Sequence, residues 1–158
     1  MTTLVDTNVL LDVATDDPKW SRWYLRLLDA AAMRGPLVMK AIVYSEFSIG
    51  YTRIEEVNRV LAGAGLELIE IPRAALFLAG KVFKRYRAHG GSRTGVLPDF
   101  FIGAHAAVAQ LPLLTRDPSP YRRYFSGITL ITPDAEPTSD DTNDAVSQRR
   151  WLVPWILA

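Results

Sequence analysis

The sequence contains no cysteine and only two histidines, His89 and His105. The lack of cysteine excludes disulfide bonds and thiolate metal sites, and it fits a protein of a reducing compartment. No apolar run approaches the roughly 18 residues of a membrane-spanning helix, and the N-terminus lacks the basic and apolar regions of a secretory signal. We therefore expect a cytoplasmic protein.

Acidic residues are absent between Glu70 and Asp99, although the formal net charge of the 158 residues is only +1. A local excess of positive charge suits a polyanionic partner, but a basic helix face is often simply solvated. Both interpretations stay open for this stretch. Its basic residues are Arg73, Lys81, Lys84, Arg85, Arg87 and Arg93.

The composition predicts one globular domain with a sizeable core, because 49% of the residues are hydrophobic and 22% are charged. We assign residues 1–133 to this domain. Residues 134–158 are predicted to form an acidic linker and an apolar C-terminal tail, disordered or loosely docked on the domain.

Short apolar runs alternate with segments of helical periodicity along the predicted domain. This alternation predicts an α/β fold with a short parallel sheet and helices on both faces. We expect strands at residues 4–5, 36–39, 66–71, 113–115 and 128–131. Helices are expected directly after Asp6 and at residues 20–34, 42–51, 55–62, 73–88 and 98–109, with a turn or short helix at 118–125.

Two of the expected strands lead to a carboxylate. Asp6 follows the first strand directly, and Asp117 lies two residues beyond the strand that ends at Thr115. In open α/β folds the carboxyl ends of the strands are where ligands bind. Helix capping by Asp6 and a turn at Asp117-Pro118 are the structural alternatives.

Two further carboxylates lie on expected helices. Glu46 shares a helix face with Ile42, Val43 and Ile49, where an unpaired carboxylate is costly unless it has a basic partner, a metal ion or access to solvent. Asp99 lies in the first turn of its helix, where the helix dipole favours a negative charge. The small and apolar residues that follow Asp99 on its face, Ile102, Gly103 and Ala106, predict close packing on the sheet.

The right-handed crossover rule makes successive strands parallel, so the four acids are expected at one edge of the sheet. Carboxylates gathered without matching basic residues repel one another, and hard divalent cations relieve that repulsion. Oxygen ligands without cysteine favour Mg²⁺ or Mn²⁺ over Zn²⁺.

Four segments of the chain, residues 4–10, 44–47, 98–106 and 114–117, together resemble the ordered motifs of PIN-domain ribonucleases. The branch they resemble most is the VapC-like toxins of bacterial toxin–antitoxin pairs, and the resemblance spans residues 3 to about 132. It implies a three-layer α/β/α domain with a short parallel sheet. It also implies Mg²⁺- or Mn²⁺-dependent cleavage of RNA, a homodimer, and inhibition by a small antitoxin that inserts near the active site.

The resemblance assigns roles to individual residues. Asp6, Glu46, Asp99 and Asp117 match the catalytic, metal-binding acids, with Asp6 and Asp99 as the principal ligands. Thr7, Asn8 and Arg116 match polar and basic residues beside these acids, and we expect them at the substrate. We also expect the basic helix and the following loop to contact the RNA backbone, in particular through Arg87 and Arg93.

Two alternative functions remain at this point. A phosphohydrolase of the haloacid dehalogenase kind also has an aspartate after its first strand, but it needs a second aspartate two residues later, where this chain has Asn8. A non-catalytic RNA-binding module with a PIN fold would normally lack one of the acids. The sequence does not identify which RNA is cleaved.

A surface for a second copy of the chain or for an antitoxin is expected on the N-terminal helices. The large apolar residues of the helix expected at residues 20–34 exceed what one helix of a small domain needs to bury, and such a surplus marks interfaces. These residues are Trp20, Trp23, Tyr24, Leu27 and Leu28.

Overall fold

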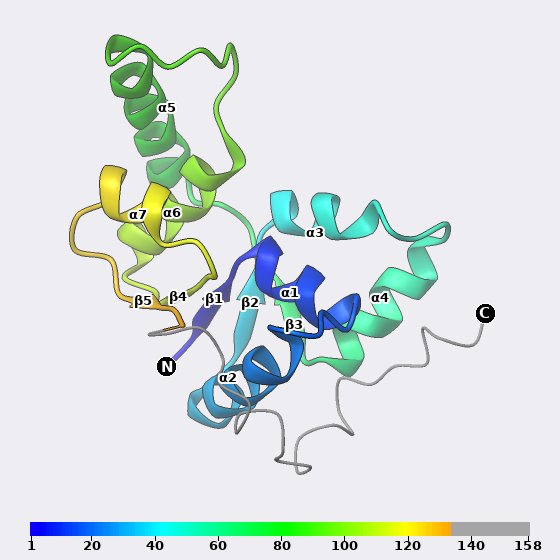
Figure 1. Cartoon of the computed structure of the whole chain (residues 1–158). Coiled ribbons are helices and arrows are strands. Elements are labelled where there is room, and N and C mark those ends of the chain that lie inside the picture. The colour runs from blue at the N-terminus through cyan, green and yellow to red at the C-terminus, as the bar shows by residue number, and fades with distance from the viewer. Residues whose placement is uncertain (134–158) are drawn as a thin grey trace.

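The computed structural model describes residues 1–133, and the predicted linker and tail lie outside the described residues. Strands and helices alternate in the predicted order (Figure 1). The strands are β1 (Thr3–Val5), β2 (Leu37–Met39), β3 (Leu66–Leu68), β4 (Leu113–Leu114) and β5 (Leu130–Ile131). The helices are α1 (Thr7–Ala14), α2 (Ser21–Arg34), α3 (Ala41–Ser48), α4 (Ile54–Gly63), α5 (Arg73–Ala88), α6 (Pro98–Ala109) and α7 (Ser119–Tyr124).

The strands form one sheet in the order β3-β2-β1-β4-β5, and every neighbouring pair is parallel. The carboxyl ends of all the strands therefore meet at one edge, as predicted. The connection after β1 leads to β2 on one side, whereas the connection after β4 leads to β5 on the other. This divergence creates the switch point at which open α/β sheets bind ligands.

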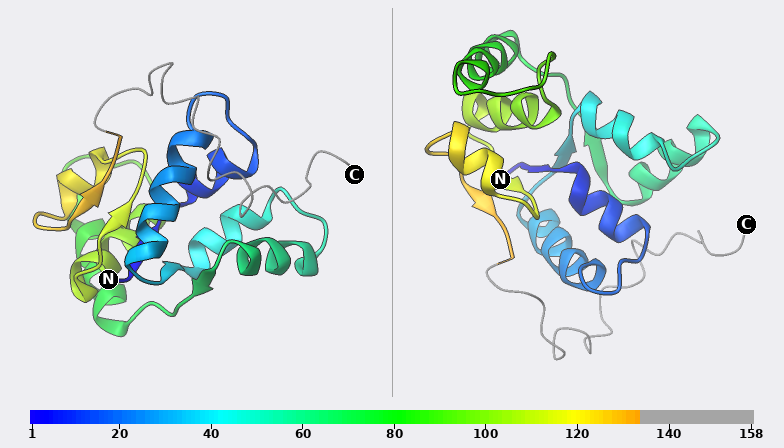
Figure 2. Two further views of the ribbon diagram at one scale, coloured as in Figure 1. Left: turned by 90° about the horizontal axis from the view of Figure 1, so that it is seen from below. Right: turned by 45° about the horizontal axis from the view of Figure 1, so that its top comes forward.

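The helices form two groups. In the first group α1 contacts α2 and α3, and α3 contacts α4. In the second group α6 contacts both α5 and α7. Figures 1 and 2 show the two groups on different sides of the strands. The arrangement confirms the predicted three-layer α/β/α fold with a short parallel sheet.

The close packing predicted for α6 is confirmed. Ile102, Gly103 and Ala106 are buried, and a Cβ atom at Gly103 would lie 2.4 Å from the ring of Phe125. Only glycine therefore lets Phe125 approach α6 this closely. The short side chains hold α6 near the sheet and bring Asp99, in its first turn, to the strand ends.

The large apolar side chains predicted for the second helix are partly used by the domain itself. Tyr24 and Leu28 are fully buried, while Trp20, Trp23 and Leu27 are half-buried against the core. Because these three side chains stay partly exposed, a partner surface built from them stays a prediction. The most exposed large apolar side chains of residues 1–133 are instead Met1, Met33, Ile49, Ile54 and Phe77.

Two smaller expectations also need correction. The third strand ends at Leu68 instead of residue 71, because the strand it pairs with ends at Met39. On α5, the helical spacing of the apolar residues predicts that Ala75, Leu76, Ala79 and Val82 face inward; all are buried except Leu76, which is exposed. Among the helices of residues 1–133, none has the length and apolar character needed to cross a bilayer.

Candidate active site

Asp6 occupies the centre of the carboxyl edge of the sheet. The register pairs Val5 of β1 with Leu114 of β4, so the next residues, Asp6 and Thr115, lie side by side. The Thr115 hydroxyl accordingly donates to Asp6 Oδ2 over 2.7 Å, and both residues are buried. Asp6 also caps α1, because its Oδ1 accepts the Thr7 backbone N–H at 2.7 Å. The capping interpretation and the site interpretation of Asp6 are thus compatible.

Two further side chains orient the Asp6 carboxylate. Asn8 Nδ2 donates to Oδ2 over 3.0 Å, and the Tyr121 hydroxyl donates to the same oxygen over 2.9 Å. Burial raises the pKa of Asp6 above its ordinary value. The hydrogen bonds from Thr115, Tyr121 and Thr7 act in the opposite direction, because they stabilise the charged form.

Glu46 on α3 reaches the site through Thr7, whose hydroxyl donates to Glu46 Oε2. Its negative charge raises the pKa of Asp6 further. The predicted apolar face around Glu46 is only partly buried, because Val43 is enclosed while Ile49 is exposed. Glu46 therefore lies at the edge of the buried stripe of α3, half-buried and turned toward Thr7.

Asp99 is half-buried in the first turn of α6. Burial raises its pKa to about 6, and the negative charges of Asp6, Glu46 and Asp117 contribute in that order. No basic side chain is among the groups that shift it. The four predicted acids, which lie on four different segments, therefore share one electrostatic environment.

Asp117 is the exposed member of the set. Its backbone N–H donates to Thr115 Oγ1 over 3.2 Å, and its Oδ1 accepts the Ser119 backbone N–H at 3.0 Å. The turn predicted at Asp117-Pro118 is therefore present. The same turn fixes the carboxylate beside the other acids, because Asp117 acts on the pKa of Asp99.

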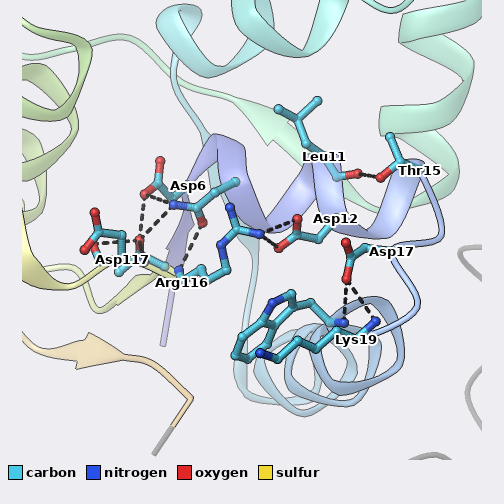
Figure 3. Close-up of polar contacts among 11 residues, drawn as sticks. Asp6, Leu11, Asp12, Thr15, Asp17, Lys19, Arg116 and Asp117 are labelled. Atoms are coloured by element: carbon cyan, nitrogen blue, oxygen red, sulfur yellow. Dashed lines mark hydrogen bonds and ion pairs between the residues drawn. The ribbon is translucent and has the colours of Figure 1, made fainter. Parts of the chain in front are cut away.

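The residues expected at the substrate divide into two groups. Thr7 and Asn8 contact the acids directly. Arg116 instead pairs with Asp12 on α1: its Nη1 atom donates to both carboxylate oxygens, at 2.8 and 2.9 Å, and Figure 3 shows its guanidinium turned toward Asp12. Arg87 donates to the carbonyl oxygens of Gly91 and Arg93, and the Arg93 side chain is exposed in that loop.

Sequence reasoning missed Tyr121, the buried α7 tyrosine that holds Asp6. It also missed the roles of Thr115 and Asp12. Thr115 had a detectable signal, since it follows a strand that neighbours β1. Tyr121 had none, because its contact with Asp6 depends on how α7 packs and not on any local pattern.

The donor chemistry of the four acids fits a hard divalent cation, which prefers oxygen ligands. The surroundings of Asp99 support this choice of ion. Its neighbours disfavour the charged form of its carboxylate, and a nearby cation would stabilise that form. As the side chains stand, no three acidic or histidine residues within positions 1–133 are close enough together to surround one ion. Shared binding of an ion by these acids would therefore require side-chain rotation.

A parallel sheet with acids gathered at its switch point is typical of α/β proteins that bind a ligand at the carboxyl ends of their strands. The particular family is also clear: the chain belongs to the PIN domain family, which matches residues 3–125. The resemblance predicted from the four segments is thereby confirmed. No curated protein is significantly similar to the chain in sequence.

Solved structures with the same fold include chains of toxin–antitoxin complexes. One, from the VapBC2 complex of Rickettsia felis bound to a promoter DNA fragment, has a TM-score of 0.65 and 19% identity, covering 85% of this chain and 100% of that chain. A toxin–antitoxin complex from Klebsiella pneumoniae has a chain with a TM-score of 0.60 and 25% identity, and the match covers 85% of this chain and 99% of that chain. A chain of VapBC-1 from nontypeable Haemophilus influenzae has a TM-score of 0.61 and 16% identity, and the match covers 84% of this chain and 98% of that chain.

Proposed function

We propose that the protein is a metal-dependent endoribonuclease that hydrolyses RNA phosphodiester bonds and serves as the toxin of a toxin–antitoxin pair. The observation that carries the proposal is the convergence of four acids at the carboxyl edge of the sheet. Thr7 bridges Asp6 and Glu46 by hydrogen bonds, and the charges of Asp6, Glu46 and Asp117 all act on half-buried Asp99. A site that gathers negative charge without a basic partner is suited to a divalent cation and a phosphodiester.

Each acid has a distinct role in this proposal. Asp6 and Asp99 would be the principal ligands for Mg²⁺ or Mn²⁺, and Glu46 and Asp117 would complete the shell directly or through water. When bound, the ion supplies Lewis-acid activation of a water and stabilises charge on the phosphate and the leaving oxygen. If water attacks the phosphorus and the 3′-oxygen leaves, taking up a proton, the products would carry 5′-phosphate and 3′-hydroxyl ends.

The surrounding residues prepare the acids for this chemistry. Asn8, Thr115 and Tyr121 fix the Asp6 carboxylate, so the principal ligand is oriented before an ion arrives. Thr7 links the first acid to Glu46, because its backbone N–H binds Asp6 and its hydroxyl binds Glu46. Loss of any of these donors is expected to reduce activity less than loss of an acid.

The toxin role rests on the relatives. The structure from Klebsiella pneumoniae is of a toxin–antitoxin complex, and those from Rickettsia felis and Haemophilus influenzae are of VapBC2 and VapBC-1. We infer from them an antitoxin partner for this protein, and we propose a homodimer on the family resemblance alone. Family membership argues against the haloacid dehalogenase alternative. A non-catalytic RNA-binding module remains the competing function, and the following experiment separates it from a nuclease.

The experiment compares wild type, Asp99→Asn and Glu70→Gln on a structured RNA. Glu70 is exposed and is not among the groups that shift the pKa of Asp99, so its variant controls for the loss of one negative charge. Wild type and Glu70→Gln should cleave with Mg²⁺ or Mn²⁺ and stop with EDTA. Asp99→Asn should lose more than about 100-fold in rate, beyond the roughly 10- to 100-fold typical of residues that only support a metal ligand.

Thermal melting of the same proteins tests the ion directly. Mn²⁺ at a hundredfold excess over its dissociation constant should stabilise wild type by about 2.7 kcal/mol, and Asp99→Asn should lose most of that gain. The proposal fails if Asp99→Asn cleaves RNA at the wild-type rate, or if Mn²⁺ shifts neither melting curve. RNA binding by wild type without any cleavage would instead favour the non-catalytic module.

A further inference from the structure

A cavity of about 270 Å³ lies beside Asp99, between α5, α6 and α7. Figure 1 shows these helices together, with α5 extending away from the sheet above α6 and α7. Asp99 belongs to both the acid cluster and the cavity wall, so the cavity adjoins the candidate active site. The cavity is also lined by Tyr86, Leu97, Phe100, Arg123 and Tyr124.

The aromatic side of the cavity is held rigidly. The rings of Phe100 and Tyr124 meet edge to face at 5.0 Å, and Tyr86 meets them at 5.7 and 6.4 Å. The loop after α5 closes over Tyr86: a Cβ atom at Gly91 would lie 2.2 Å from its ring, and the Arg93 backbone N–H donates to its hydroxyl at 3.3 Å. A ligand therefore meets a preformed aromatic surface, with little ordering entropy to lose.

Two positively charged side chains lie over the ring of Tyr124. The guanidinium of Arg123 lies 5.4 Å from the centre of the Tyr124 ring, and that of Arg85 lies 5.7 Å from it. Arg85 also donates to the Tyr124 backbone oxygen over 2.7 Å, which ties α5 to the end of α7. Both arginine residues are exposed, so their charges remain available to an anionic ligand.

We propose that this cavity is a base-binding subsite, which takes one unstacked nucleobase of a single-stranded RNA next to the phosphodiester at the acid cluster. The inference rests on the proposed nuclease function and adds how the substrate is positioned. Single-stranded RNA is recognised by stacking of splayed bases on aromatic rings and arginine planes. The cavity offers both kinds of surface within reach of Asp99.

The same features argue against two simpler explanations. An aromatic cluster that only joins α5 to α6 would not need two exposed arginine residues over its outermost ring. A cavity made for a peptide would be served by apolar walls alone, whereas this one has Arg123 in its wall beside the rings and next to a set of acids that suits a phosphodiester. A protein segment as occupant remains an outcome of the test.

The test measures binding of short single-stranded RNA to the full-length protein in EDTA, so that cleavage does not interfere. An abasic nucleotide is moved one position at a time along the oligonucleotide. For wild type, one position should weaken binding by about 5- to 100-fold, the range expected when one stacked base is lost. The other positions should change affinity by less than about threefold.

Arg123→Ala and Arg122→Ala form a matched pair. Both residues are exposed arginines of α7, but only Arg123 lines the cavity. Arg123→Ala should weaken binding of intact RNA and reduce the abasic penalty, whereas Arg122→Ala should keep the full penalty. Because the abasic scan also works on wild type alone, a folding defect in a variant does not weaken the test.

The outcomes for the two proposals are separate. A wild-type protein that cleaves RNA with Mn²⁺ but shows no abasic-sensitive position overturns the subsite and leaves the nuclease intact. Equal abasic penalties in the two arginine variants also overturn it and leave the cavity to a protein partner. An abasic effect without any metal-dependent cleavage contradicts the nuclease alone.

Discussion

Two neighbouring positions at the same edge of the sheet carry opposite kinds of buried charge. Asp6 follows β1 and Lys40 follows β2, and the two side chains are 4% and 0% exposed. Asp6 accepts hydrogen bonds from Thr7, Asn8, Thr115 and Tyr121. Among residues 1–133, Lys40 Nζ has a single partner, the Nε2 atom of His105 at 3.4 Å, and the buried Nδ1 of that histidine has none.

The comparison shows that hydrogen bonds offset part, but not all, of what burial costs an ionisable group. The Asp6 carboxylate is oriented and supported in its charged form. Burial lowers the pKa of Lys40 to about 8, and burial together with the charge of Lys40 lowers the pKa of His105 to about 4. Both regions therefore carry a cost in stability, which hydrogen bonds reduce at Asp6 and leave largely uncompensated at the Lys40–His105 pair.

The two regions should respond to pH in opposite directions. Lys40 has its pKa lowered from 10.5 to about 8, so the unfolded chain binds more protons and stability rises with pH across that window. Asp99 has its pKa raised from 3.8 to about 6, so the folded chain binds more protons there and stability rises as pH falls from 6 toward 3.8. Both windows can be tested by single substitutions.

The largest effect is expected from Lys40→Met, which replaces the buried amine with an apolar chain of similar length. The lowering of the Lys40 pKa from 10.5 to about 8 corresponds to a cost of about 3 kcal/mol at pH 7, and the variant should recover much of it. Urea unfolding between pH 7 and pH 10.5 should show a flatter pH dependence than wild type. Lys84→Met, at an exposed position of α5, is the control; a less stable Lys40→Met protein would contradict the account.

A smaller effect is expected from Asp99→Asn in EDTA. Removing one of the mutually repelling carboxylates should stabilise the metal-free protein by about 1–2 kcal/mol at pH 7, below the full value of its pKa shift because Asp99 is only half-buried. The gain should vanish below pH 3.8, where Asp99 is protonated in both states. Thermal melting as a function of pH measures it. A variant less stable than wild type at pH 7 would reduce Asp99 to a helix-start residue.

The smallest effect is expected from Tyr121→Phe, which removes one donor from Asp6 and leaves the other three. The loss should cost about 1 kcal/mol and raise the pKa of Asp6 further. Tyr24→Phe is a close control, because the Tyr24 hydroxyl is also buried but has no hydrogen-bond partner within residues 1–133. Equal unfolding free energies for the two variants would mean that the Tyr121 hydroxyl does not support Asp6.

The sequence was sufficient for the parts of the fold and site that depend on local patterns. The alternation of strands and helices predicted the parallel sheet, and strand ends pointed to Asp6 and Asp117. The destination of long side chains was not predictable. Arg116 was expected at the substrate but binds Asp12, a residue more than a hundred positions earlier, because the crossover brings α1 beside the end of β4. The burial of Lys40 against His105 depends on long-range packing in the same way.

The central place of β1 also determines how the site responds to local unfolding. β1 is paired on both sides, by β2 and β4, and the Asp6 amide donates to the Leu114 oxygen over 3.0 Å. Amides enclosed in this way exchange with solvent only when a large part of a domain opens, whereas edge strands such as β5 open in smaller fluctuations. Asp6 is therefore attached to a strand that is paired on both sides, while exposed Asp117 belongs to a turn that can fluctuate without breaking the sheet. One part of the site keeps its position as the other moves.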